Sequence, residues 1–103
     1  MIKVCTLIKR RQGLSREDFA DWWLKRHAPR ACKLEGLKRY QISLALGEDE
    51  SAYDGMAELW FDSVEELRQA FATDLGRALA ADSQAQASER VRIVVKENLI
   101  LGG

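Results

Sequence analysis

Residues 14–31, LSREDFADWWLKRHAPRA, organise the rest of the chain, because they carry the signals of an amphipathic helix. Ser15 can cap the first turn, and Asp18 three residues later supplies the second half of a capping box. At about 100° per residue, one stripe of the helix collects the apolar side chains and the only histidine: Phe19, Ala20, Trp23, Leu24, His27 and Ala31. The stretch therefore predicts a helix that turns His27 inward, one turn after a tryptophan.

Pro29, the only proline, follows His27 by two residues. Its nitrogen cannot donate to the carbonyl of Lys25, and its ring disfavours helical geometry at Ala28. We therefore expect the helix to kink or end at this point. An inward-facing histidine beside a helix irregularity is the first place to look for chemistry.

The composition bounds the class of protein. A chain of 103 residues suits one domain, which we place at residues 1–103. Its 16 basic residues balance its 16 acidic ones, so no net field favours nucleic acid or an anionic membrane. No apolar segment approaches the roughly 20 residues that span a bilayer, and the first residues follow a strand pattern rather than that of a signal peptide. Cys5 and Cys32 lack CxxC spacing and suit reduced structural thiols. We therefore expect a cytoplasmic protein with no nucleic acid and no membrane as partner.

Hydrophobic periodicity predicts four strands and two helices in the order βαββαβ. The strands are expected at residues 2–9, 37–46, 53–61 and 91–95, with an acidic turn at 47–51. The second helix begins at the capping box of residues 63–66 and is interrupted at Gly76; residues 77–81 could add a short turn, and the polar residues 83–88 are expected to form a loop. Two helices on one face of a four-stranded antiparallel sheet is the ferredoxin-like α+β plan.

Three of the four strands carry apolar residues in both alternation phases. These residues are Ile2, Val4 and Ile8 with Cys5 and Leu7, Leu59 and Phe61 with Met56 and Trp60, and Val91, Ile93 and Val95 with Val94. Two helices can cover only one face of the sheet, so the second face needs a partner. A symmetric homodimer through that face is expected, with Val94 near its centre and the apolar tail of residues 99–101 adding to the contact.

Several motifs, in this order, resemble the EthD family. They are Leu7-Ile8-Lys9-Arg10-Arg11, Gly13-Leu14-Ser15-Arg16-Glu17-Asp18-Phe19, Trp23 with His27-Ala28-Pro29, Glu35-Gly36-Leu37-Lys38-Arg39-Tyr40, Tyr53-Asp54-Gly55-Met56-Ala57-Glu58-Leu59-Trp60-Phe61 and Ala80-Ala81-Asp82. The resemblance implies a dimeric α+β barrel, in which two four-stranded sheets close back to back. It also implies the label of reductase or oxidoreductase that family members commonly carry by association with ether-degradation gene clusters.

Isomerases and polyketide-tailoring dehydratases are similar to this family in fold and in the helix-one histidine. They are cofactor-free and work by proton transfer, and by that similarity His27 and Tyr40 match positions that line the site. The sequence departs from the family at residues 86–88, where an aromatic followed by an acidic residue is usual.

His27 and Tyr40 are the candidate catalytic residues. An imidazole with a pKa near its reference value of about 6.5 can both take and give a proton at neutral pH. The alternative is a core histidine that is hydrogen-bonded to a neighbour. Tyr40 could anchor a ligand oxygen or simply pack. One histidine without cysteine or carboxylate at ligand spacing is a poor metal site, and no phosphate-binding glycine pattern follows a strand. We therefore expect no metal and no cofactor.

Trp23, Glu58 and Trp60 are the candidate substrate-binding residues. A carboxylate inside an apolar phase is unusual, because burying an unpaired charge is costly. Glu58 therefore either faces a pocket or pairs with an arginine such as Arg39 or Arg92, and the ion pair is preferred. The two tryptophans could form the wall of a cavity for a planar substrate, although such residues are more often core.

Two functions follow from these residues. The first is a small cofactor-free enzyme, an isomerase, dehydratase or oxidoreductase of the EthD type, that acts on an apolar or aromatic oxygenated metabolite such as a lactone or polyketide-like ring. His27 would be the general acid and base, and Tyr40 its hydrogen-bonding partner. The second is a non-catalytic protein that binds a hydrophobic small molecule, in which His27 only shapes the pocket.

Overall fold

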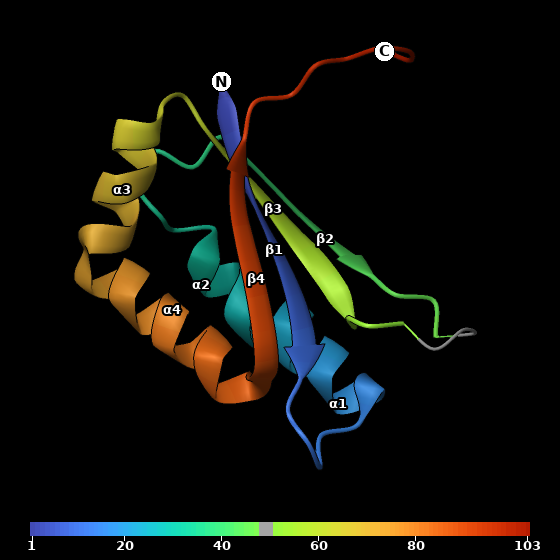
Figure 1. Cartoon of the computed structure of the whole chain (residues 1–103). Helices are drawn as coiled ribbons and strands as arrows, with labels where there is room; N and C mark the ends of the chain where they lie inside the picture. Colours follow the sequence, from blue (N-terminus) through green and yellow to red (C-terminus); the bar gives the residue numbers. More distant parts are fainter. Residues whose placement is uncertain (48–50) are drawn as a thin grey trace.

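A four-stranded antiparallel sheet with helices on one face forms the described part of the chain, residues 1–47 and 51–103 of a computed structural model (Figure 1). The expected acidic turn falls partly on residues 48–50, which lie outside the described residues. The elements in chain order are β1 (Ile2–Arg10), α1 (Arg16–Asp21), the π-helix η1 (Trp22–His27), α2 (Ala28–Ala31), β2 (Arg39–Leu44), β3 (Gly55–Phe61), α3 (Val64–Ala72), α4 (Asp74–Gln86) and β4 (Ala87–Val95). The ferredoxin-like α+β fold expected from the sequence is confirmed.

The sheet has the strand order β2-β3-β1-β4, so β1 and β3 are its central strands. β1 carries Val4, Thr6 and Ile8 on the face that the helices cover, and all three are buried. On the neighbouring strands the register places Leu59 and Val94 opposite Val4, and Arg90 opposite Ile8. The core therefore fills the space between this face and the helices.

The first helical arm runs from α1 to α2 and contains the irregularity that Pro29 imposes. As expected, Ser15 caps α1 by accepting a hydrogen bond from the Asp18 N–H, 3.0 Å away. The arm neither ends nor breaks at Ala28. It widens into the π-helix η1, in which the Ala28 N–H bonds to the carbonyl of Trp23, and then continues to Ala31. The additional residue in this turn displaces the backbone ahead of the proline ring, so the helix can run past it.

The wide turn also changes which side chains point inward. Trp22 is buried together with Trp23 and His27, whereas Leu24 is 46% exposed. The sequence-based stripe, which assumed the α-helical angle throughout, is therefore wrong for Leu24 and missed Trp22.

The second helical arm is broken at Thr73 rather than at Gly76. α3 ends at Ala72, Thr73 is extended, and its hydroxyl accepts from the Gly76 N–H at 3.0 Å to cap α4. A Cβ at position 76 would clash with the carbonyl oxygen of Ala70, so glycine here permits the close approach of the two helices.

α4 extends to Gln86, so the expected loop at residues 83–88 is wrong. Its alanines and glutamines are good helix formers, and Ser83 is buried against the core. β4 follows α4 directly and begins at Ala87.

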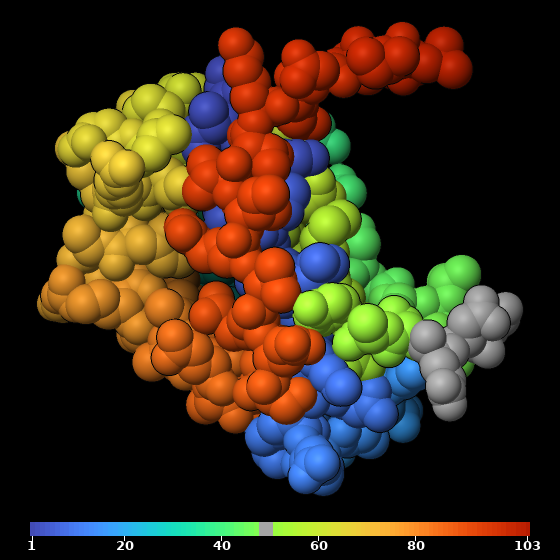
Figure 2. Space-filling model, viewed as in Figure 1, coloured from blue at the N-terminus to red at the C-terminus, as the bar shows by residue number. Residues whose placement is uncertain are grey.

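The helices cover one face of the sheet (Figure 1). The other face, which we call the open face, has an apolar stripe. By register, its residues include Lys3, Cys5, Leu7, Met56, Glu58, Trp60, Val91, Ile93 and Val95. Ile93 is 56% exposed. Val94, which the sequence placed near the centre of a contact surface, is opposite Val4 and belongs to the helix-covered face. The tail of residues 99–101 projects from the body of the molecule (Figure 2) and is highly exposed.

Candidate functional site

His27 and Asp82 form a hydrogen-bonded pair between the two helical arms. His27 is the last residue of η1 and is 8% exposed, and Asp82 lies on α4. The distance between His27 Nδ1 and Asp82 Oδ2 is 2.8 Å. The indole Nε1 of Trp22 lies 3.2 Å from both carboxylate oxygens, and Arg30 Nη1 lies 3.8 Å from Oδ2. Three side chains of the first helical arm, those of Trp22, His27 and Arg30, therefore lie around the carboxylate of Asp82.

The π-helix is what brings these groups to one carboxylate. Residues five apart in an α-helix are about 140° apart around the axis, so Trp22 and His27 would point in different directions. In η1 their ring centroids are 4.9 Å apart, and both reach Asp82. A π-turn inside a helix is often found at a functional site.

The contact with Asp82 sets the chemistry of the imidazole. A carboxylate can only accept, so Nδ1 must carry the proton in the pair. In the neutral ring the lone pair is then on Nε2, which is the nitrogen able to take a proton from a ligand. The adjacent Trp22 ring helps to hold this orientation. The arrangement can support general acid–base catalysis.

A cavity of about 50 Å³ lies between the helices and the covered face of the sheet, and His27 borders it. Its walls are largely apolar and include Trp23, Leu59 and Phe71. Its polar lining comes from Thr6, His27, Tyr40, Ser83 and Arg90. The cavity has room for a small functional group or one or two water molecules, because a water molecule in the liquid occupies about 30 Å³.

Tyr40, on β2, lines this cavity. Burial raises the pKa of its phenol well above the usual range, because the phenolate would lose hydration. A tyrosine is protonated at neutral pH in any case, and burial extends this to alkaline pH, so the phenol of Tyr40 can donate a hydrogen bond to a ligand oxygen.

The structure brings together three of the five predicted site residues. Trp23, His27 and Tyr40 all line the cavity. Glu58 and Trp60 lie on the open face, because they alternate with Leu59, which faces the helices. The sheet therefore separates these two residues from His27.

Glu58 belongs to an ion pair, as preferred from the sequence, but with a different partner. Its carboxylate is 2.5 Å from the ammonium of Lys3, rather than paired with Arg39 or Arg92. Lys3 is its partner because β1 and β3 are neighbours in the sheet. The hydrogen bond with Glu58 raises the pKa of Lys3. Arg39 instead lies over the Trp60 ring, 4.5 Å from its centroid.

Sequence reasoning missed Asp82 and Arg90 as site residues. Asp82 is 55 positions from His27, and only the fold joins them. Periodicity over residues 63–88 would have had to extend α4 past Gly76 to place Asp82 on a helix. Arg90 precedes the apolar run that marked β4, so nothing local distinguished it from a solvated charge.

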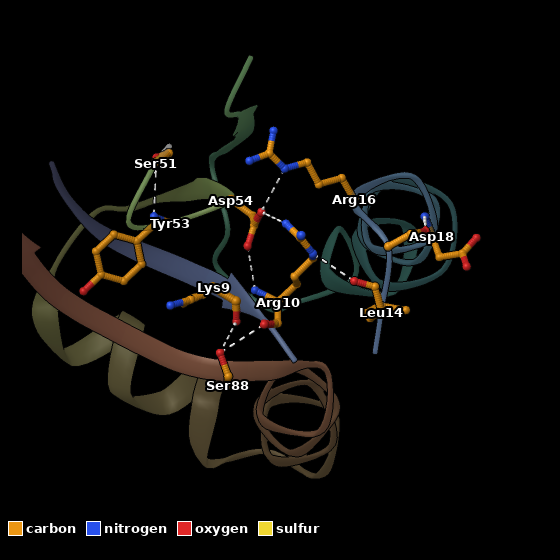
Figure 3. Close-up of polar contacts among 10 residues, drawn as sticks. Lys9, Arg10, Leu14, Arg16, Asp18, Ser51, Tyr53, Asp54 and Ser88 are labelled. Carbon is orange, nitrogen blue, oxygen red and sulfur yellow. Dashed lines mark hydrogen bonds and ion pairs between the residues drawn. The ribbon is translucent and has the colours of Figure 1, made fainter. Parts of the chain in front are cut away.

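A second hollow of about 800 Å³ lies where β1 leads into α1, but its central charge is already paired (Figure 3). Asp54 accepts a hydrogen bond from the Arg10 backbone N–H at 2.8 Å and forms an ion pair with the Arg10 guanidinium. Arg16 Nε lies 3.7 Å from the same carboxylate, and Arg10 Nε donates to the carbonyl of Leu14 at 2.8 Å. These contacts join the start of β3 to the entry of the first helical arm.

The described residues include neither a metal-binding cluster nor a membrane-spanning helix. Residues 1–47 and 51–103 contain no group of three or more His, Cys, Asp or Glu side chains placed to hold a metal ion. None of the helices in this part of the chain has both the length and the apolar character needed to cross a membrane.

The βαββαβ fold and the His27–Asp82 pair define the class: a ferredoxin-like α+β protein with a candidate acid–base site. The model of the EthD domain matches residues 11–87. The chain belongs to the EthD family, as the sequence motifs indicated. No curated protein matches it in sequence.

Solved structures share the fold over most of the chain. An ethyl tert-butyl ether D (EthD) family protein from Bacillus halodurans has 27% identity and a TM-score of 0.84, with 95% of this chain and 99% of that chain covered. A dimeric ferredoxin-like protein of unknown function from Thermobifida fusca has 18% identity and a TM-score of 0.77, with coverages of 91% and 88%. A mutant of SnoaB, a cofactor-independent oxygenase from Streptomyces nogalater, has 14% identity, a TM-score of 0.74 and coverages of 99% and 97%. The last two likenesses concern the fold alone.

Asp82→Ala should allow the neutral His27 ring to adopt either tautomer. The chain has one histidine, so the ¹⁵N resonances of its ring are unambiguous. In the wild type at a pH where the ring is neutral, we expect Nδ1 to be protonated, because Asp82 accepts from it. In the variant the two tautomers should both be populated. Asp74→Ala is the matched control on the same helix, since Asp74 pairs with Arg77 at the surface. A wild-type ring protonated mainly at Nε2 would contradict the assignment.

Tyr40→Phe should reduce the loss of stability at alkaline pH. The phenol of the unfolded chain ionises near its ordinary pKa of about 10, whereas burial raises the pKa of Tyr40 in the folded state. Above about pH 10 the unfolded chain therefore binds fewer protons, and the free energy of unfolding falls as pH rises. Urea unfolding at about pH 8 and about pH 11 measures this fall. Tyr53→Phe controls for the loss of a phenol, and an equal fall in wild type and Tyr40→Phe would refute the prediction.

Proposed function

We propose that this protein is a small cofactor-free enzyme that moves a proton on an apolar or aromatic oxygenated compound. The observation that carries the proposal is the His27–Asp82 pair, because it leaves one imidazole nitrogen available at a cavity. His27 would take the proton through Nε2 and return it to another atom of the same ligand. Tyr40 would donate a hydrogen bond to the ligand oxygen on which negative charge develops.

The surroundings of the pair support proton transfer. Trp23, Leu59 and Phe71 give the cavity an apolar wall, and a water-poor site strengthens each polar interaction inside it. The cavity is much smaller than the roughly 300 Å³ or more of sites that enclose a drug-sized ligand. We therefore propose that it encloses the reacting end of the substrate and that the remainder extends outward. This chemistry covers isomerisation, in which the proton returns to another atom of the substrate, and dehydration, in which a C–O bond also breaks and the proton goes to the hydroxyl group that leaves as water.

His27→Ala should slow turnover strongly. Lactones, quinones and polyketide-like diketones are incubated with the protein in D₂O, and ¹H NMR follows loss of C–H signals, isomerisation and dehydration together. For any compound that the wild type converts, the variant should be slower by about 10²- to 10⁴-fold, the usual contribution of an acid–base group. Lys25→Ala, an exposed position on the same π-helix, is the control and should keep the wild-type rate.

Two outcomes of this experiment would decide against the enzyme. Conversion that survives in His27→Ala would remove the proposed role of the histidine. Compounds that raise the melting temperature of both proteins but are converted by neither would favour the alternative, a binding protein for a hydrophobic small molecule.

We further propose that the protein forms a homodimer through the open face, closing the two sheets into a dimeric α+β barrel. The apolar stripe that includes Leu7, Val91 and Ile93 supports this arrangement, because soluble monomers rarely expose a contiguous apolar patch of more than a few hundred Å². The tail of residues 99–101 would add to the contact. The similar protein from Thermobifida fusca is itself described as dimeric.

Ile93→Asp should give insoluble or unfolded protein, because it places a charge in the proposed contact. Burial of apolar surface contributes about 25 cal/mol per Å², and losing the contact removes much of the stability of the folded chain. Leu24→Asp is the matched control, since Leu24 is similarly exposed but lies on the helical arm. Sedimentation equilibrium of the wild type at low micromolar concentration is the direct measurement, and a stable species of 11.7 kDa would overturn the dimer.

A further inference from the structure

Arg90 is a cationic residue of the cavity that neither the His27–Asp82 pair nor the packing of the core explains. It lies near the start of β4, opposite the buried Ile8, so its side chain belongs to the helix-covered face. It lines the same cavity as His27 and Tyr40. In Figure 2 the boundary between β4 and the helices α3 and α4 is hollowed part of the way along the strand.

The guanidinium of Arg90 has an unmatched donor. Among the described residues, its Nε is the one buried side-chain nitrogen or oxygen that lacks a hydrogen-bond partner. A buried donor without an acceptor is destabilising, and more so when it carries charge. Such groups are rare in native proteins, so each one needs an explanation.

The protein groups around Arg90 do not provide the missing anion. None of the ion pairs within residues 1–47 and 51–103 involves Arg90 or Arg92. Arg92 is two residues further along β4 on the same face and lies over the Phe71 ring, 5.7 Å from its centroid. The carboxylate of Asp82 is already used by His27, Trp22 and Arg30. Burial and the neighbouring charge of Arg92 both lower the pKa of Arg90, as expected for a cation without a counter-ion.

We propose that the ligand of this cavity carries a carboxylate, which Arg90 binds through its Nε–H. A guanidinium matches a carboxylate in charge and in the geometry of its donors, and charge-assisted hydrogen bonds are the stronger ones. The positive charge of Arg90 at the cavity favours an anion over a neutral carbonyl. The inference rests on the proposed function only in that both place the ligand in the same cavity.

The size of the cavity agrees with this assignment. A volume of about 50 Å³ suits a carboxylate group but does not enclose an aromatic ring. Of the polar lining, Tyr40 and Arg90 are donors and His27 Nε2 is an acceptor, so the site offers donors to a ligand oxygen and a base to a ligand proton. A carboxylate on Arg90 would fix the orientation of the ligand with respect to His27.

Acetate is a suitable probe, because it consists of little more than the proposed group. The wild-type protein is titrated with sodium acetate at constant ionic strength, and a ¹H–¹⁵N spectrum follows the Arg90 Nε–H signal, which is assigned with Arg90→Lys. We expect a saturable change of this signal with acetate and none with acetamide or sodium chloride. Arg90→Gln should weaken acetate binding by about 10- to 100-fold, the range expected for a lost charge-assisted hydrogen bond. Arg92→Gln, the matched control on the same face, should retain binding within a few-fold.

Each alternative result overturns the proposal. An Arg90 signal that acetate leaves unchanged would show that the site takes no carboxylate, and an equal response to chloride or acetamide would remove the specificity. Equal loss in Arg90→Gln and Arg92→Gln would assign the effect to net charge. His27→Ala should still bind acetate, so loss of turnover and loss of the carboxylate site are separate outcomes. The measurement on the wild type holds even where Arg90→Gln fails to fold.

Discussion

The wide turn before Pro29 is the constraint on which the site depends. A proline within a helix lacks a backbone N–H donor and crowds the preceding turn. In this chain a π-helix over Trp22–His27 accommodates the proline, and the helix does not break. The changed angle turns Trp22, Trp23 and His27 inward together. Trp22 and His27 then share Asp82, which ties the first helical arm to the second. A regular α-helix of the same sequence could not direct both groups to one carboxylate.

The distribution of charge around the cavity follows from that arrangement. The carboxylate of Asp82 contacts the first helical arm, where it accepts hydrogen bonds from the rings of Trp22 and His27 and lies near Arg30. Arg90, which reaches the cavity from β4, is left with a donor and no acceptor among the described residues. Tyr40 is protonated at neutral pH, and burial keeps it protonated at alkaline pH by raising its pKa. The interior is therefore rich in donors and has one base, His27 Nε2, which is the pattern required to remove a proton next to a group that becomes more negative.

Local patterns predicted the element order, the Ser15 cap, the faces of β3 and the inward direction of His27, because each depends on residues close in sequence. The extent of α4 was not predicted, because the polar composition of residues 83–88 indicated a loop, whereas the alanines and glutamines among them favour a helix. The partner of Glu58 could not be found either, as it depends on which strands are neighbours in the sheet. For the same reason the His27–Asp82 pair and the unmatched Arg90 emerge only from tertiary structure. Alternation fixes the face of a residue, and only the fold shows what lies opposite it.

The two faces of the sheet border different parts of the molecule, and β3 contributes side chains to both. Leu59 lines the cavity, whereas its neighbours Glu58 and Trp60 lie on the open face with Lys3 and Arg39. A second copy on the open face would thus touch the cavity only through the strands that both sides share. Its effect on chemistry would be to hold β1 and β3 in place, which fixes Tyr40 and Arg90 on the adjacent edge strands relative to His27. Assembly would then act on the site through the position of the sheet, and the proposed reacting groups would all come from one chain.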